Sequence, residues 1–197
     1  RADVSVGLRL ASFVAPVLVL DEPTPGAPNS DGEATFQPRP PTFSVPRGHV
    51  DDPFELTLRA RGGGEVYLTT DGSVPSATPA QRYTQPLSVA TSRTVRAIAV
   101  FPDLGVTTVE ATNTYVFLDE AIAAPTMQAR ITADPIYGPM VRPALQAYPS
   151  VFITAPTTLT ALDKVAVAVE FYDPSGAEPG FATTAGAKLV GSHSLGA

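Results

Sequence analysis

The amino-acid sequence predicts an all-β protein: a two-layer β-sandwich with an extended proline-rich flank and a small additional β region. Three observations predict this class. Short segments of alternating apolar and polar residues are separated by turn residues. Proline (21) and glycine (15) are abundant, and both interrupt helices. Hydrophobic residues make up 44% of the chain, enough for a core, whereas long helix-forming residues such as lysine, glutamine and methionine are scarce.

Length and charge limit the function classes. At 197 residues, the chain is one large domain or one domain with substantial flanks. Its net charge of -6 repels phosphate backbones and argues against a nucleic-acid partner. The absence of cysteine excludes disulfides and thiolate metal sites. The longest apolar run, residues 13–20, contains Pro16 and is far shorter than the ~20 residues that a membrane-spanning helix needs.

Residues 1–40 form the first predicted segment. Residues 2–10 and 14–20 predict short strands, and the second is the clearer because it is apolar and β-branched. A run of prolines follows and ends any strand pairing, since proline lacks a backbone donor. The polar, proline-rich stretch 30–41 predicts a linker.

Residues 41–118 predict the sandwich. In residues 54–60 every second side chain is apolar, so one face lies in a core and the other in water. Residues 93–101 are apolar on both faces, which predicts a central strand. Six or seven strands at this spacing indicate an immunoglobulin-like (Ig-like) or fibronectin-III-like sandwich. Strands are expected at residues 43–45, 54–60, 66–70, 87–89, 93–101 and 107–117.

Residues 119–197 predict a linker and an incomplete β region. Residues 140–147 predict one or two helical turns, and residues 157–163 a short helix. Strands are expected at residues 150–154, 164–172 and 188–190. The valines of the second strand either pack within their own domain, which we favour, or form a partner interface by strand addition. Two or three strands are marginal alone, so this region must pack on the sandwich or on further chain.

The central segment carries a fairly specific set of residues. These are Phe43, Gly48, residues 54–58 (FELTL), residues 66–75 (VYLTTDGSVP), Tyr83, Pro86, Leu87, residues 94–97 (TVRA) and residues 114–117 (TYVF). In this pattern, over about residues 41–117, the chain resembles the chitobiase/β-hexosaminidase C-terminal domain, an Ig-like module attached to many secreted bacterial proteins. The family more often has a second aromatic residue where Leu68 stands. The resemblance implies an Ig-like sandwich and, as one function, carbohydrate binding beside an enzyme.

The flanks carry further resemblances. Residues 1–5 (RADVS) and 23–29 (PTPGAPN) resemble the end of a bacterial lamin-tail-type domain. Residues 149–151, 169–176, 180–181, 185–186 and 191–194 resemble the start of a CotH-type (spore-coat kinase-like) domain, although Gly191-Ser192 stands where that family often has Gly-Gly before its serine. This order of modules implies an internal piece of a larger secreted bacterial protein. Any catalytic residues of a CotH-type domain would lie beyond Ala197.

Two acidic groups invite a ligand-site interpretation. The triplet Asp71-Gly72-Ser73 can be taken for a calcium loop, but the DxDxDG spacing is absent and a hairpin turn explains it better. A second cluster consists of Asp51, Asp52 and Glu55. It allows a weak calcium site, and a solvated loop is the preferred interpretation. The two histidines, His49 and His193, have no partners at metal spacing, so neither zinc nor another cofactor is expected.

Tyr67, Tyr83 and Tyr115 are the candidate ligand face, because flat aromatic rings stack on sugars. The preferred alternative is core packing with an Ig-type corner tyrosine, since the chain has no tryptophan and only 8% aromatic residues.

We therefore expect a non-catalytic structural or interaction module (a spacer, docking or assembly surface) of a larger, extracellular or cell-surface bacterial protein. Its expected partners are other subunits or other domains of the same polypeptide. One alternative is a carbohydrate-binding accessory module. Another is the N-terminal part of a CotH-type kinase-like protein, which nucleotide binding by the longer product would test.

Overall fold

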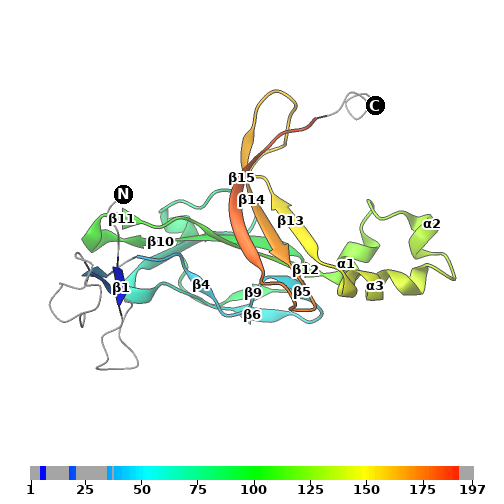
Figure 1. Cartoon of the computed structure of the whole chain (residues 1–197), viewed down its shortest axis with the longest axis horizontal. Helices are drawn as coiled ribbons and strands as arrows, with labels where there is room; N and C mark the ends of the chain where they lie inside the picture. The colour runs from blue at the N-terminus through cyan, green and yellow to red at the C-terminus, as the bar shows by residue number, and fades with distance from the viewer. Residues whose placement is uncertain (1–4, 8–17, 21–34, 37, 191–197) are drawn as a thin grey trace.

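The computed structural model describes residues 5–7, 18–20, 35–36 and 38–190. This described part contains five β-sheets and three α-helices. The sandwich lies in the middle, with a small N-terminal sheet at one end and a helical arm at the other (Figure 1). A three-stranded C-terminal sheet stands on one side of the sandwich. The predicted all-β, Ig-like class is confirmed.

The N-terminal sheet joins three short, separate segments. Its strands are β1 (Ser5–Gly7), β2 (Leu18–Leu20) and β3 (Thr35–Phe36), paired antiparallel in that order. The first two lie within the predicted strands. The third lies in the stretch predicted as a linker, so that prediction is wrong at Thr35–Phe36, where a β-branched and an aromatic residue favour a strand. The proline-rich motif at residues 23–29 lies outside the described residues.

The first layer of the sandwich is a five-stranded sheet around β10. Its strands are β5 (Gly48–Val50), β8 (Glu65–Thr69), β10 (Arg93–Phe101), β11 (Val106–Thr107) and β12 (Ala111–Phe117). Strand β10 pairs with β8, β11 and β12, which confirms its predicted central position. The strand predicted at residues 107–117 is confirmed over β12, but residues 108–110 are irregular and separate β12 from β11. Strand β5 pairs parallel with β12, an interaction that the sequence did not indicate.

The second layer consists of two strand pairs, β4 with β7 and β6 with β9. Their bounds are β4 (Thr42–Phe43), β6 (Phe54–Leu56), β7 (Leu58–Arg59) and β9 (Leu87–Val89). The predicted strand at residues 54–60 is interrupted at Thr57. Its backbone N–H donates to Ser44 Oγ, and its carbonyl accepts from Ser44 N, both at 2.9 Å. The chain thus changes its pairing partner at this residue while its alternation of faces continues.

Apolar side chains of the two layers form one core. Its buried members are Leu56, Leu58, Val66, Val89, Val95, Ala97, Tyr115 and Phe117. Leu56 and Leu58 were predicted to face the core, and both are buried. The Tyr115 hydroxyl donates to Val45 O at 2.8 Å, and its ring meets Phe54 edge-to-face at a centroid distance of 5.1 Å. This corner tyrosine therefore buries its ring and still satisfies its only donor.

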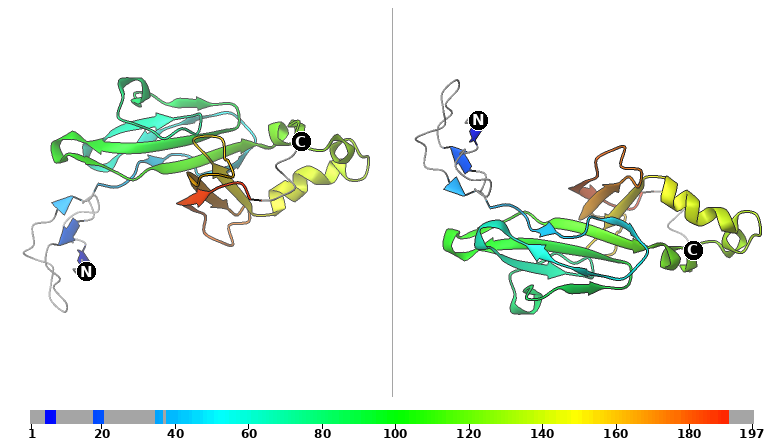
Figure 2. Two further views of the ribbon diagram at one scale, coloured as in Figure 1. Left: turned by 90° about the horizontal axis from the view of Figure 1, so that it is seen from above. Right: turned by 90° about the horizontal axis from the view of Figure 1, so that it is seen from below.

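A helical arm follows the sandwich directly. It consists of α1 (Leu118–Ala123), α2 (Ala129–Thr132) and α3 (Gly138–Ala147). The helical turns predicted at residues 140–147 are confirmed within α3, whereas α1 and α2 were not predicted. Arg142 of α3 pairs with Asp51, in the loop after β5, and with Asp119 of α1. No residue of α2 or α3 is buried, so the arm projects from the end of the sandwich (Figure 2).

The C-terminal sheet is antiparallel. Its order is β13 (Ser150–Thr154), β14 (Val165–Tyr172) and β15 (Phe181–Ala187). The strands predicted at residues 150–154 and 164–172 are confirmed. The helix predicted at residues 157–163 and the strand predicted at 188–190 are wrong, because both segments are irregular and the third strand is β15. Glycine and alanine in β15 weaken its β-propensity and hid it from the sequence analysis.

Candidate binding surfaces

The triplet Asp71-Gly72-Ser73 makes a turn after β8. Asp71 Oδ1 accepts hydrogen bonds from Ser73 N at 3.0 Å and from Ser73 Oγ at 2.6 Å. These bonds, above all the one from the Ser73 side chain, lower the pKa of the Asp71 carboxyl. Gly72 has a φ of 84°, which glycine adopts without the strain that a β-carbon would cause. The geometry is that of an Asx turn, with the carboxylate directed at its own backbone.

The acidic cluster does not gather into a metal site. Within residues 38–190, no group of three or more His, Cys, Asp or Glu side chains could hold a metal ion. Asp51 pairs instead with Arg142, whose Nη1 lies 3.0 Å from Asp51 Oδ1. The weak calcium site considered for Asp51, Asp52 and Glu55 therefore has no geometric support in the described structure. The loop at residues 191–194, which includes His193, lies outside the described residues.

The three tyrosines of the candidate ligand face do not share one surface. Tyr115 is fully buried in the core and cannot touch a ligand. Tyr67 is 8% exposed, and its hydroxyl donates to Glu65 Oε2 at 2.7 Å, an interaction that raises the pKa of Tyr67. Glu65 also pairs with Arg82 at 2.6 Å. Only Tyr83, which is half-buried, reaches a pocket. The idea of a three-tyrosine face is thus wrong, because two of the rings pack inside.

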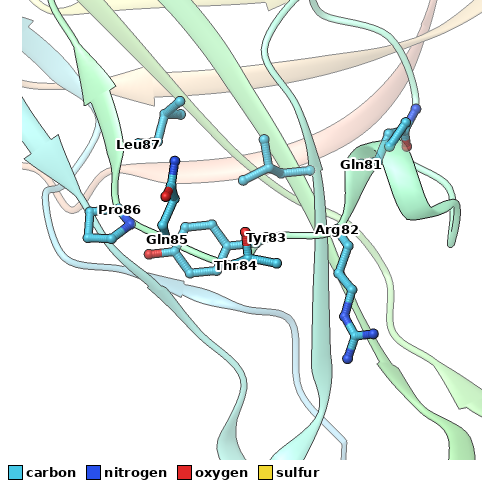
Figure 3. Close-up of a pocket in the computed structure, with 9 residues that line it drawn as sticks. Gln81, Arg82, Tyr83, Thr84, Gln85, Pro86 and Leu87 are labelled. Atoms are coloured by element: carbon cyan, nitrogen blue, oxygen red, sulfur yellow. The ribbon is translucent and has the colours of Figure 1, made fainter.

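A shallow pocket of about 230 Å³ opens beside Tyr83. Its lining residues are Leu68, Ala80, Gln81, Arg82, Tyr83, Thr84, Gln85, Pro86 and Leu87. Figure 3 shows the Tyr83 ring beside Gln85 and Pro86, while the Arg82 side chain extends away from them. One aromatic ring with nearby amides and a hydroxyl can receive a small polar ligand that also has an apolar face.

The joint between the C-terminal sheet and the sandwich contains a buried carboxyl group. Glu170 of β14 is completely buried. Its Oε1 accepts from Thr114 N of β12 at 3.0 Å, and its Oε2 lies 2.5 Å from Thr114 Oγ1. Strand β5 pairs with β12 only from Tyr115 onward, so the Thr114 N–H lies on a stretch of β12 that β5 leaves unpaired. Glu170 thus supplies the partner of one backbone N–H on this edge.

Further polar contacts extend the joint on both sides of Glu170. Arg47 Nη1 lies 3.5 Å from Glu170 Oε1 and donates to Phe181 O at 2.7 Å. Thr114 Oγ1 lies 2.9 Å from Thr94 Oγ1, which lies 3.1 Å from Thr154 Oγ1 of β13. Burial, the largest cause, raises the pKa of Glu170, and its partners oppose that shift. The sequence analysis missed this group, although one glutamate in the apolar run VAVAVEFY was a usable signal.

An aromatic contact closes the other end of the joint. The Tyr172 ring lies against Gly48, whose φ is 133°; a β-carbon there would come within 2.3 Å of the ring. His49 packs edge-to-face on Tyr172 at 5.1 Å, and its Nε2 lies 3.2 Å from Ser150 Oγ. Burial lowers the pKa of His49, with Asp51 opposing the shift. The positive φ and the close approach of the Tyr172 ring explain why only glycine fits at this position.

The outer face of the C-terminal sheet is apolar. Side chains alternate along β14, so Val169 and Phe171 point away from the sandwich that Glu170 contacts. Val151 (59% exposed), Ile153 (61%) and Phe181 (52%) share this outer face. The rings of Phe171 and Phe181 stack at a centroid distance of 5.6 Å. We call these five residues the outer apolar face.

Comparison with known proteins finds a family that is similar to the central part of the chain. Residues 45–112 match the family model described as the chitobiase/beta-hexosaminidase C-terminal domain. The match runs from just before β5 to the start of β12, so it describes the sandwich. No curated protein matches the chain, and no solved structure does.

The family model that matches residues 45–112 describes an Ig-like, non-catalytic accessory domain. The lamin-tail-type and CotH-type resemblances concern residues outside the matched range and remain predictions. None of the described helices has the length and apolar character needed to cross a membrane.

Proposed function

We propose that the chain is a non-catalytic interaction module of a larger secreted or cell-surface bacterial protein. In this proposal the sandwich is a spacer, and the C-terminal sheet is a docking surface. The observation that carries the proposal is the contrast between the two faces of the C-terminal sheet. One face is bound to the sandwich through Glu170, and the other exposes the outer apolar face. The accessory family matched by the sandwich supports a non-catalytic role.

The spacer role is supported by the way the parts are connected. Strand β12 belongs to the sandwich sheet and also carries Thr114, the direct partner of Glu170. The helical arm is held to the sandwich by the Arg142–Asp51 pair. Directional hydrogen bonds to a buried carboxyl define one orientation better than apolar contact does. The sandwich therefore presents the C-terminal sheet in a defined direction.

The docking role is supported by the outer apolar face. Contiguous exposed apolar side chains on a protein surface commonly mark an interaction site. No charged residue belongs to this face, so the partner surface that fits it is apolar. We propose that the partner is a neighbouring domain of the same polypeptide or a neighbouring subunit.

Site-specific crosslinking of the full-length polypeptide tests this function. A photo-crosslinking amino acid at Ile153 should give crosslinks to a second domain or subunit. The control position is Val109, which is 77% exposed and lies on the sandwich. Crosslinking from Ile153 and not from Val109 supports docking. Equal yields at both positions, or no crosslink from Ile153, would overturn it.

A second candidate function is carbohydrate binding at the pocket beside Tyr83. The specific observation is that Tyr83 lies among Gln81, Gln85 and Thr84, groups that can stack on a sugar ring and bond its hydroxyls. The glycosidase association of the matched family supports a carbohydrate-related accessory role.

An oligosaccharide titration tests this second function. Chitin oligosaccharides added to the isotope-labelled chain should shift the amide signals around Tyr83, with micromolar affinity. Tyr83→Ala should abolish the shifts, whereas Tyr148→Ala, a matched change on the exposed helical arm, should leave them unchanged. Absence of shifts, or shifts that persist in Tyr83→Ala, would reject the pocket as a sugar site.

A further inference from the structure

The carboxyl group of Glu170 lies where proteins rarely place an ionisable side chain. It is completely buried between two sheets that share no strand pairing. A buried carboxylate loses its hydration and is retained only where partners replace the lost water. Here the neighbouring groups are a backbone N–H, one hydroxyl and one guanidinium 3.5 Å away. The non-catalytic function proposed above does not itself explain why the joint uses an acid rather than an amide.

The surrounding hydroxyl groups can satisfy the carboxyl in both of its protonation states. When Glu170 is ionised, Thr114 donates to Oε2, Thr94 donates to Thr114, and Thr154 donates to Thr94. When Oε2 carries a proton, it donates to Thr114 Oγ1 instead, and each hydroxyl in turn donates to the next one along. The heavy-atom distances of 2.5, 2.9 and 3.1 Å suit either direction, because a hydroxyl both donates and accepts.

We propose that the joint is a protonation-sensitive contact: Glu170 takes up a proton on Oε2 as the pH falls, the threonine chain reverses, and the C-terminal sheet is held more tightly than at neutral pH. The proton comes from solvent during brief openings of the joint. No covalent bond other than the new O–H is formed. In neutral solution the sheet separates from the sandwich more often, because the ionised carboxylate gains hydration outside the joint.

The direction of this pH dependence follows from the shift in the pKa of Glu170. Burial raises the pKa of Glu170 in the docked state above the ordinary value of 4.5. The stabilisation is therefore complete below 4.5 and is lost as the pH rises through the docked-state pKa. Each unit by which the docked and undocked values differ corresponds to about a tenfold change in the docking equilibrium.

Four other titratable side chains lie at the joint: Arg47, Tyr115, His49 and Tyr172, whose ring packs on Gly48 and His49. Arg47, from the segment before β5, favours the ionised carboxyl. Tyr115 of β12 stays neutral in this range, because burial raises its pKa to about 12. His49 of β5 acts in the opposite direction: burial lowers its pKa, so its contribution is lost as the pH falls below about 6.5. The experiment must therefore separate Glu170 from His49.

Hydrogen exchange of the Thr114 amide measures the joint directly, since this N–H donates to Glu170 Oε1. In the full chain and in His49→Gln, its protection at pH 5, corrected for intrinsic exchange, should exceed that at pH 7.5. Because the stabilisation is complete only below 4.5, this ratio is smaller than the limit of about tenfold per unit of pKa separation, which is approached only at lower pH. A carboxyl-detected titration should place the Glu170 midpoint above the ordinary value.

Glu170→Gln provides the matched variant, because its amide can donate to Thr114 Oγ1 and accept from Thr114 N as the protonated acid would. In Glu170→Gln, the Thr114 amide should be as well protected at pH 7.5 as it is in the wild type at pH 5. Glu55→Gln, on an exposed residue of β6, should behave as the wild type. An ordinary midpoint for Glu170 would overturn the proposal. The proposal would also be overturned if the Thr114 amide of His49→Gln were as well protected at pH 7.5 as at pH 5. Protection of this amide that still depends on pH in Glu170→Gln would overturn it too. Crosslinking at Ile153 is a separate readout, so the docking function and this inference can fail independently.

Discussion

The sandwich core and the joint of the C-terminal sheet are both buried, but apolar side chains form the core and polar side chains form much of the joint. In the core, apolar side chains from the two layers pack together. In the joint, a carboxyl, a guanidinium and threonine hydroxyls carry the contact. Apolar burial is large and non-directional, whereas a buried hydrogen bond is modest in net energy and strict in geometry. The core therefore provides stability, and the joint provides orientation.

The largest expected effect comes from opening the core. Leu56→Ala removes a completely buried side chain at the centre of the second layer. The lost burial and the remaining cavity should lower the free energy of unfolding by about 2–5 kcal/mol. Urea unfolding followed by far-UV circular dichroism is the measurement, because the chain has no tryptophan. Val109→Ala, on an exposed position, should change little. A cost below about 1 kcal/mol for Leu56→Ala would mean that the core lies elsewhere.

Next in size is a substitution that opens the joint from its aromatic end. Gly48→Ala should cost about 1–3 kcal/mol, because it places a β-carbon against the Tyr172 ring and imposes side-chain strain at a φ of 133°. Replacing Tyr172 by alanine should remove the part of that cost that comes from contact with the ring. The cost of Gly48→Ala should therefore be smaller in a Tyr172→Ala background than in the wild type. Equal costs in the two backgrounds would show that ring contact does not matter.

The same contrast explains what the sequence could and could not predict. Alternation in residues 54–60 and the double-faced apolar pattern of β10 predicted core strands, because burial leaves a periodic trace. The joint leaves no such trace, since Thr114 and Thr154 are ordinary strand residues whose meeting depends on tertiary packing. The parallel pairing of β5 with β12 was also missed, because Gly48–Val50 is too short for a period. Strand β15 was missed because its glycine and alanine residues have a low β-propensity.

Thr114→Val is expected to have a smaller effect that is restricted to the joint. It keeps the shape of the side chain but removes the hydroxyl that serves Glu170 and Thr94. An unsatisfied buried acceptor costs about 1–3 kcal/mol, so amides of β14 should lose protection from hydrogen exchange, whereas those of β8 should keep theirs. Thr112→Val is the matched control on the same strand, since the Thr112 hydroxyl makes no hydrogen bond to the described residues. Equal loss in both variants would contradict a specific joint.

The smallest effect tests the turn that packs against the joint, where a β-carbon on Gly72 would come within 2.9 Å of Thr154 Cγ2. Because hydrogen bonds from Ser73 lower the pKa of Asp71, the stabilisation that they supply is present above the ordinary value of 3.8. It is lost as the pH falls through the lowered value. Ser73→Ala removes the strongest of these bonds, so a carboxyl titration by NMR should show the Asp71 midpoint moving upward toward its ordinary range. Asp134, whose pKa is lowered by the backbone amides of Tyr137 and Ile136, should not move. If the Asp71 pKa stays lowered in Ser73→Ala, the backbone N–H of Ser73 alone holds the turn. The Ser73 hydroxyl then contributes nothing to the turn that packs against Thr154.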